Sequence, residues 1–383
     1  MNRSSGGPSA DTPPGVENLQ GTSERLEHGC AMGCVSIVFG VPAVWLYWMV
    51  RTFLDGDTWY DFIVRSILDE LILALGLFAL VLGALPLLTD SGVHINFAMM
   101  ALYAGLMGMA WNILAGFGGQ FSFGHSLFFG FGAYVQIIAQ LSWGINPWFA
   151  ILLAIAASAA VGAFVGALSF RYGLRGSYFA LVTLAFAEVA RILALSVDIT
   201  GGGGGLMLPL QTSAANMQFE SKLGFFYLIL FMVVIALLLT QWLKNSRVGA
   251  YLQAVRDNED AARAAGVNPF RVKLSGIVLS GAMMGATGAF YVQVFQYVDP
   301  AIAFGPQSSV EALVAAIVGG LGTVWGPLLG ALVLHTLSDV TRNLFGSLPG
   351  INMVIYGSVL VLIVMFLPRG IAGIGVSVKE LWA

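Results

Sequence analysis

The sequence predicts an all-α protein, a polytopic transmembrane bundle of roughly ten or eleven helices with one further helix on the cytoplasmic side. Composition carries this prediction. Of the 383 residues, 58% are hydrophobic and only 10% are charged, whereas soluble domains carry roughly 25% charged residues. The mean hydropathy is +0.84. Because so little polar surface cannot cover a water-soluble globule, lipid must form part of the solvent.

Apolar segments of about 20 residues, the length that crosses the hydrocarbon core of a bilayer, recur along the chain. We predict spans near residues 30–50, 71–88, 95–117, 123–142, 147–170, 176–198, 223–243, 274–297, 308–320, 326–342 and 351–367. Residues 1–28 are polar and lack the basic start and apolar run of a signal peptide, so we expect a disordered tail. Residues 29–92 then form a transmembrane extension before the main bundle.

The positions of Lys and Arg predict the orientation, because short cytoplasmic loops retain these residues. If the spans alternate, most of them fall on the side of the loop at residues 244–273. We therefore expect this loop and the C-terminus in the cytoplasm, and the glycine-rich segment 199–221, with the N-terminal tail, outside. The net charge of −3 is small, and it points to neither nucleic acid nor an acidic partner. Membrane lipid is the partner that the apolar composition predicts.

The polar loop between two spans predicts a cytoplasmic helix. Residues 251–265 contain no Gly or Pro, Gly266 follows them, and Pro269 lies just beyond, which is how a helix is stopped. The helix is expected to present five charged residues to the cytoplasm: Arg256, Asp257, Glu259, Asp260 and Arg263. Its small alanines, Ala261, Ala262, Ala264 and Ala265, are expected to let a partner surface approach closely. A helix resting on lipid headgroups is the alternative, but the clustered carboxylates favour docking into a groove of a partner protein.

Part of this helix resembles a known family. Residues 260–266 (DAARAAG) resemble the EAA-x3-G signature of ABC importer permeases, with Asp in place of Glu. The longer run 254–269 is similar to the LivM-type permeases of branched-chain amino acid importers, as are residues 118–134, 174–184, 188–191 and 199–202. The resemblance extends from residue 93 to about residue 370, so residues 93–383 are assigned to a permease domain. The later Ile-x-Leu-Pro element of the general signature has no match after Gly266, so the maltose-type permease fold is not implied.

The resemblance implies a set of partners and no chemistry on this chain. It implies a second permease of LivH type, two ATP-binding subunits, a periplasmic substrate-binding protein, and a place in the bacterial inner membrane. No catalytic residue and no cofactor is expected here, since ATP is bound by the partner subunits. The sequence agrees: residues 201–205 are not followed by the Gly-Lys-Ser/Thr of a P-loop. It also lacks an HExxH motif, a Ser-centred elbow or a Cys/His cluster that would indicate an enzyme or a metal site.

Two charged residues lie inside a predicted span. Glu188 and Arg191 are spaced to share one helix face. Since a charge inside the bilayer is costly, both are expected to face protein or a water-filled cavity. They form either a structural ion pair or part of the translocation path. Thr183, on the same predicted span, is a further candidate for the path.

A second group of polar residues surrounds a glycine-rich interruption at residues 116–119. Asn112, Gln120, Ser122 and His125 lie there, where a broken helix could offer free backbone groups to the ammonium and carboxylate of an amino acid. Ordinary polarity at a membrane boundary is the alternative. Residues 118–124 and 319–326 form a weak internal repeat of this interruption.

Three functions compete. The favoured one is a permease subunit that forms part of a path for leucine, isoleucine and valine. A permease for urea or another short-chain amide shares the same motifs and is the alternative. A secondary transporter would be expected to carry more paired acids within the membrane than this chain offers.

Overall fold

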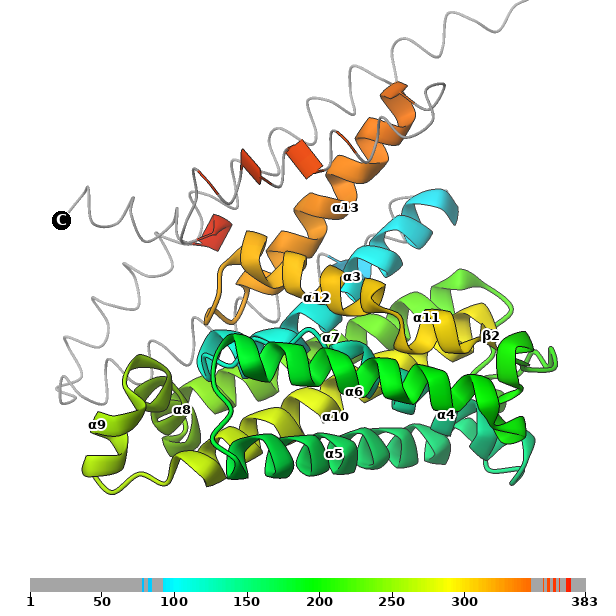
Figure 1. Cartoon of the computed structure of the whole chain (residues 1–383). Helices are drawn as coiled ribbons and strands as arrows, with labels where there is room; N and C mark the ends of the chain where they lie inside the picture. The colour runs from blue at the N-terminus through cyan, green and yellow to red at the C-terminus, as the bar shows by residue number, and fades with distance from the viewer. Residues whose placement is uncertain are drawn as a thin grey trace, which may run out of the picture. The chain divides into compact units, whose positions relative to one another are not determined.

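The computed structural model describes residues 92–345 without a gap, together with isolated positions between 78 and 84 and between 354 and 372. The predicted tail at 1–28 and the predicted span at 30–50 lie outside the described residues, as do most of the predicted spans at 71–88 and 351–367. The described part is a helical bundle, as predicted (Figure 1).

Long helices follow one another in the order of the predicted spans. They are α3 (Gly92–Asn112), extended by a π-helical turn η1 (Ile113–Phe117), α4 (His125–Leu141), α5 (Pro147–Arg171), α6 (Ser177–Ser196), α7 (Lys222–Asn245), α10 (Pro269–Phe295), α12 (Pro306–Gly319) and α13 (Gly326–Phe345). Helix α12 begins at Pro306, before the predicted start at residue 308. A short helix α11 (Pro300–Phe304), capped by Asp299, precedes it. Six segments of the described part are long and apolar enough to cross a membrane.

Shorter elements fill the connections. The loop after α6 contains three 3-10 turns, η2 (Asp198–Thr200), η3 (Gly202–Gly204) and η4 (Ala214–Asn216). Strand β1 (Leu206–Met207) in the same loop pairs antiparallel with β2 (Tyr297–Val298), which follows α10. Helices α8 (Arg247–Asp257) and α9 (Glu259–Ala264) connect α7 to α10.

Helix α10 lies at the centre of the bundle and packs against α5, α4 and α3. Glycine makes the closest approaches possible. A Cβ at Gly132 of α4 would lie only 2.1 Å from the carbonyl oxygen of Gly285, and one at Gly288 of α10 would lie 2.1 Å from that of Phe129. Small residues let helix backbones meet in this way when lipid gives apolar side chains no preference for each other.

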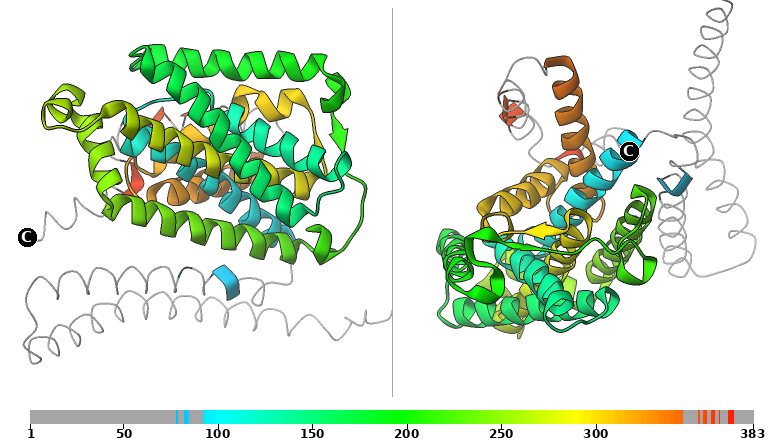
Figure 2. Two further views of the ribbon diagram at one scale, coloured as in Figure 1. Left: turned by 90° about the horizontal axis from the view of Figure 1, so that it is seen from below. Right: turned by 90° about the vertical axis from the view of Figure 1, so that its right-hand side faces the viewer.

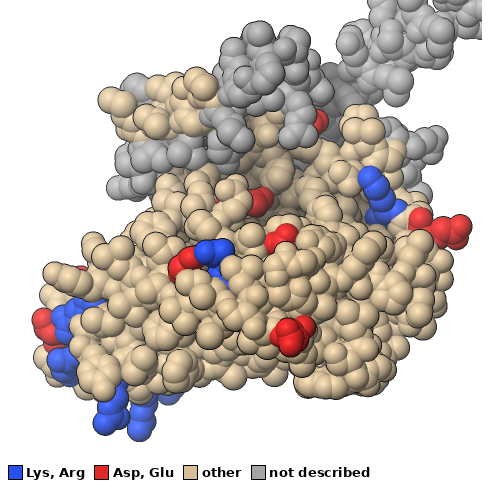
Figure 3. All heavy atoms as spheres, turned by 45° about the vertical axis from the view of Figure 1, so that its right-hand side comes forward, with Lys and Arg blue, Asp and Glu red and all other residues tan. Residues whose placement is uncertain are grey.

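The two polar connections lie at opposite ends of the bundle. Helices α8 and α9 precede α10, and strand β2 follows it, so α10 separates them by 27 residues of helix. Figures 1 and 2 show α8 and α9 at one end and the strands at the other. Lys and Arg side chains gather mainly at one end, and the surface between the ends is largely uncharged (Figure 3). This arrangement agrees with the alternation of spans that the sequence predicts.

Candidate coupling and translocation site

The predicted cytoplasmic helix at residues 251–265 is two helices, so the prediction of a single helix was wrong. The first of the two, α8, begins earlier than predicted, at Arg247, where the Ser246 side chain accepts a hydrogen bond from the amide of Gly249. It breaks at Asn258, whose backbone is extended with φ −157° and ψ 105°. The Asn258 side chain accepts hydrogen bonds from the amides of Asp260 and Ala261 and so caps α9. Asn competes for backbone groups in this way, which favours a helix start over a helix interior.

The predicted stop at Gly266 is where α9 ends. Gly266 has φ +89°, in the left-handed region that glycine enters without a steric penalty. The amide of Val267 donates to the carbonyl of Ala262, and that of Gly266 to the carbonyl of Arg263. These bonds satisfy the last carbonyls of α9 in the usual manner of a glycine-terminated helix.

Helix α9 has an outward and an inward face, whereas the sequence predicted that its charged residues Glu259, Asp260 and Arg263 all face the cytoplasm. The side chains of Asp260 and Arg263 are 77% and 59% exposed, and that of Asp257, at the end of α8, is 68% exposed. Ala262 is only 5% exposed, so its prediction as a cytoplasmic contact was wrong. Ala262 lies on the inward face of α9, which packs against α8 and α10. The exposed alanines of this helix and its end are Ala261, Ala264 and Ala265.

Glu259 holds α9 to the bundle. Its carboxylate lies 2.6 Å from Nζ of Lys273 on α10, 3.2 Å from Nε of Arg175 and 3.4 Å from Nη2 of Arg263. The Lys273 side chain is 4% exposed and also lies over the ring of Phe170, 5.7 Å from its centroid. A cavity of about 400 Å³ lies beside this cluster, between α9, the α5–α6 turn and the start of α10. One carboxylate therefore ties three chain segments together at this end.

Asn112 joins two segments that are far apart in the sequence. We call residues 118–124 the first glycine segment and residues 319–326 the second glycine segment. The Asn112 side chain accepts a hydrogen bond from the amide of Gly322 and donates one to the carbonyl of Thr323, both at 2.8 Å. Asn112 is fully buried. Its amide is thus used by the protein in this conformation, and its role in substrate binding stays a prediction.

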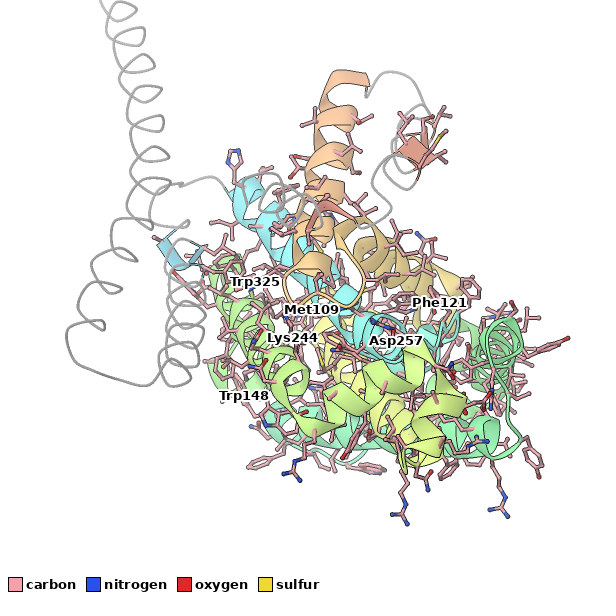
Figure 4. The ribbon with its side chains drawn as sticks, turned by 90° about the vertical axis from the view of Figure 1, so that its left-hand side faces the viewer. Met109, Phe121, Trp148, Lys244, Asp257 and Trp325 are labelled. Atoms are coloured by element: carbon pink, nitrogen blue, oxygen red, sulfur yellow. The ribbon has the colours of Figure 1, made fainter. Side chains whose placement is uncertain are left out.

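The second glycine segment meets η1, the turn just before the first glycine segment, at the end of the bundle where α8 lies. Figure 4 looks onto this end. It labels Phe121 of the first glycine segment, Trp325 of the second glycine segment and Asp257 of α8. Nη1 of Arg256 donates to the carbonyl of Gly116, just before the first glycine segment, at 2.8 Å. The weak repeat in the sequence thus corresponds to two interruptions that touch in space.

The other polar residues of the first glycine segment are also buried. The Gln120 side chain donates to the carbonyl of Gly118, but its Oε1 has no partner among the described residues. Ser122 accepts from the amide of Gly124, and its carbonyl accepts from the indole of Trp111. Thr183 of α6 bonds its own helix at Ala180. Thr183 nevertheless borders this segment, since a Cβ at Gly124 would lie 2.0 Å from its carbonyl oxygen.

Glu188 and Arg191 form an ion pair on α6. Nε of Arg191 donates to the Glu188 carboxylate at 2.9 Å, and the two side chains are 48% and 30% exposed. The pair therefore lies on the surface of this chain, near the middle of a helix long enough to span the membrane. Within the part of the chain that the structure describes, no three His, Cys, Asp or Glu side chains gather to hold a metal ion.

Comparison with known proteins agrees with this architecture. The family described as a branched-chain amino acid transport system permease component matches residues 93–365. The chain belongs to this family.

The chain is similar to LivM and to LivH, two permease proteins of high-affinity branched-chain amino acid transport systems. LivM, a high-affinity branched-chain amino acid transport permease of Salmonella typhimurium, is 28% identical over 313 residues, which cover 75% of this chain and 72% of LivM. LivH of Escherichia coli is 24% identical over 293 residues, covering 70% of this chain and 90% of LivH. The L-arabinose ABC transporter permease AraH of Azospirillum brasilense is 28% identical over 216 residues, covering 55% and 61%. No solved structure matches this permease.

Sequence reasoning missed several residues of the site. Lys273 served only to predict orientation, and Arg175 served for orientation and for the family resemblance. The pairing of both with Glu259 could not be predicted, because Glu259 lies far from Arg175 in the sequence. His125 was interpreted either as a polar group beside a broken helix or as ordinary polarity at a membrane boundary. It is fully buried, with Nε2 2.8 Å from the hydroxyl of Ser280. The Ser280 hydroxyl in turn donates to the carbonyl of Ala110 on α3. Only the fold brings these residues together.

Proposed function

We propose that this chain is one of two permease subunits of an ABC importer for leucine, isoleucine and valine in the bacterial inner membrane. The names of LivM and LivH support the solute class. The second permease is of LivH type, two separate ATP-binding subunits supply the energy, and a periplasmic protein delivers the solute. The observation that carries the proposal is the outward face of α8 and α9, which projects from the end of a membrane bundle.

The outward face suits docking into a cleft of an ATP-binding subunit. Ala261, Ala264 and Ala265 are small and exposed, so a partner surface can approach the backbone closely. Asp260 and Arg263 beside them are charged and exposed, so they can fix the register of docking. The Glu259 cluster keeps this face rigid, so that force applied to α9 reaches α10 and the α5–α6 turn.

The second permease is proposed to cover α6. Only 28% of the spans of α5 and of α6 is buried in this chain. Residues 147–170 of α5 carry no charge, so the exposed face of α5 suits lipid. The exposed face of α6, in contrast, carries Glu188 and Arg191. Because charged side chains avoid lipid, the exposed pair needs protein or water around it. The interface with a second permease, where the translocation path would run, supplies both.

The path itself is proposed to include Gln120, Ser122 and Thr183 at the first glycine segment. The unpaired Oε1 of Gln120 offers an acceptor for an ammonium group or a bridging water. Asn112 borders the same place and would enter the path when its bonds to the second glycine segment open.

The test is uptake by proteoliposomes that contain both permeases and both ATP-binding subunits. With the cognate binding protein and ATP inside the vesicles, labelled leucine, isoleucine and valine are expected to accumulate, and excess urea to leave their uptake unchanged. Uptake of urea in place of the amino acids would support the amide importer. Accumulation without ATP, driven by an ion gradient, would contradict the ABC permease and support a secondary transporter.

A further inference from the structure

Arg256 belongs to α8, but its side chain enters the bundle. Nη1 donates a 2.8 Å hydrogen bond to the carbonyl oxygen of Gly116, and Nε pairs with Asp257 at 3.0 Å. Gly116 lies in η1, the π-helical turn that ends the first long span of the described part. Turns of this kind depart from the regular backbone ladder and concentrate at functional sites.

The backbone of the first glycine segment packs directly against α8. Gly119 has φ +66°, and a Cβ there would lie 2.6 Å from Cγ of Arg256. A Cβ at Gly118 would lie 3.3 Å from the fully buried side chain of Leu252, which also lies against Gly276 of α10. Because no side chain separates α8 from this backbone, a displacement of α8 must move the segment or open a gap, and packed interiors resist gaps.

The same guanidinium reaches the second glycine segment. A Cβ at Gly322 would lie 3.2 Å from Nη1 of Arg256 and 3.2 Å from the carbonyl oxygen of Gly116. Asn112 ties Gly322 and Thr323 to the end of α3 through both atoms of its amide. Helix α8, the end of the α3 span and the second glycine segment therefore form one cluster around a single side chain.

We propose that Arg256 is the positioning residue that transmits movement of α8 to both glycine segments at once. This inference rests on the proposed function, in which the ATP-binding subunits move α8 and α9. The two segments connect α3 to α4 and α12 to α13, so a shift at Arg256 changes the ends of four helices together. When α8 moves, the Gly116 carbonyl loses its donor, and the segments that Asn112 holds together are released to rearrange.

The test measures movement at the two ends of this contact separately. Cys30 and Cys34 are replaced by serine, and spin labels are placed in one of two pairs. The pair Ala254 and Leu152 reports on α8, and the pair Leu321 and Leu152 reports on the second glycine segment; all three positions are exposed, and Leu152 lies near the opposite end of the bundle. Distances are measured by pulsed electron paramagnetic resonance in the reconstituted complex, without nucleotide and after trapping with ATP and vanadate.

With Arg256 present, trapping is expected to change both distances. In Arg256→Gln the α8 distance still changes, the Leu321 distance does not, and solute transported per ATP hydrolysed falls by about tenfold. Arg256→Lys keeps one donor and the charge, so it is expected to restore part of the Leu321 change, which a merely structural loss would not do. Arg271→Gln removes an exposed charge on α10 and behaves like the parent.

The outcomes separate this proposal from the function on which it rests. If both distances still change in Arg256→Gln, or if transport per ATP is unaltered, Arg256 does not transmit the movement and the proposal is overturned alone. If trapping leaves the α8 distance unchanged in the parent complex, the proposed function fails as well. If the complex that carries Arg256→Gln does not assemble, the same two distances are measured in Arg256→Lys. A change in the Leu321 distance equal to that of the parent then overturns the proposal.

Discussion

Lys273 is a cation that this protein keeps almost fully buried, with 3% of the residue exposed. Glu259 supplies the nearest carboxylate, at 2.6 Å. Removing one partner of a buried pair leaves the other charge uncompensated, which is more harmful than removing both. Glu259→Gln is therefore expected to lower the stability of the bundle by about 3 kcal/mol, measured as a lower midpoint of thermal unfolding in detergent.

The double variant and a surface control complete this test. Adding Lys273→Met to Glu259→Gln removes the stranded charge and is expected to recover much of the loss. Asp260→Asn, one residue along at a side chain that is 77% exposed, is expected to change the midpoint little. Equal midpoints for Glu259→Gln and Asp260→Asn would contradict the role given to Glu259.

Glu188 and Arg191 on α6 are expected to stabilise each other. Neutralising Glu188 alone or Arg191 alone leaves one charge in a poor solvent, whereas neutralising both removes the problem. We expect Glu188→Gln and Arg191→Gln each to reduce the membrane level and thermal stability of the assembled complex, and the double variant to lose less than the sum. If the loss in the double variant equals the sum of the losses in the two single variants, Glu188 and Arg191 do not stabilise each other across their 2.9 Å contact.

At the scale of elements, the division between α8 and α9 depends on one cap. Asn258 accepts hydrogen bonds from two amides at the start of α9, and the loss of such a cap costs about 1 kcal/mol. Asn258→Ala is expected to weaken α9 by this amount, seen as faster amide hydrogen exchange at residues 260–264 with α10 unaffected. Asn258→Asp keeps the acceptor and is expected to keep the slow exchange. Identical exchange in the two variants would rule out the cap.

The sequence could predict the helices but not this division. Runs of apolar residues placed the spans from residue 95 to residue 342, because a chain in lipid must satisfy its backbone hydrogen bonds internally and therefore forms helices there. Asn258 is a poor helix former and also a good cap, and only the packing of Leu252 and Ala262 against the bundle decides which role it takes. Periodicity likewise could not show that Ala262 faces inward, because alanines occupy both faces of α9.

At the scale of the whole molecule, the sidedness of the bundle is a prediction from Lys and Arg. A single cysteine at Gly204, in the loop with β1, is expected to react with a membrane-impermeant thiol reagent from the periplasmic side of intact cells. A cysteine at Ala265, at the end of α9, is expected to react only after the membrane is opened. Both are placed in a chain without Cys30 and Cys34. Labelling of both positions from the same side would contradict the topology.

The contacts between distant segments are what the sequence predicts least. The repeat of two glycine segments was visible as a pattern, but their meeting through Asn112 spans 210 residues and needed the structure. The substrate path also stays a proposal, because its polar residues are spread over α3, the first glycine segment and α6. Covering α6 with a second permease would complete it.

The outward face of α9 is proposed to receive force from the ATP-binding subunits, and Ala264→Trp places a bulky side chain on this face. Ala264 is exposed on this face, so tryptophan should block docking without entering the bundle. Leu152→Trp on the exposed side of α5 is the control. At equal membrane levels, we predict that Ala264→Trp loses co-purification with the ATP-binding subunits and ATP-dependent leucine uptake, while Leu152→Trp keeps both. If leucine uptake by Ala264→Trp equals that of the control, the outward face of α9 does not dock on the ATP-binding subunits.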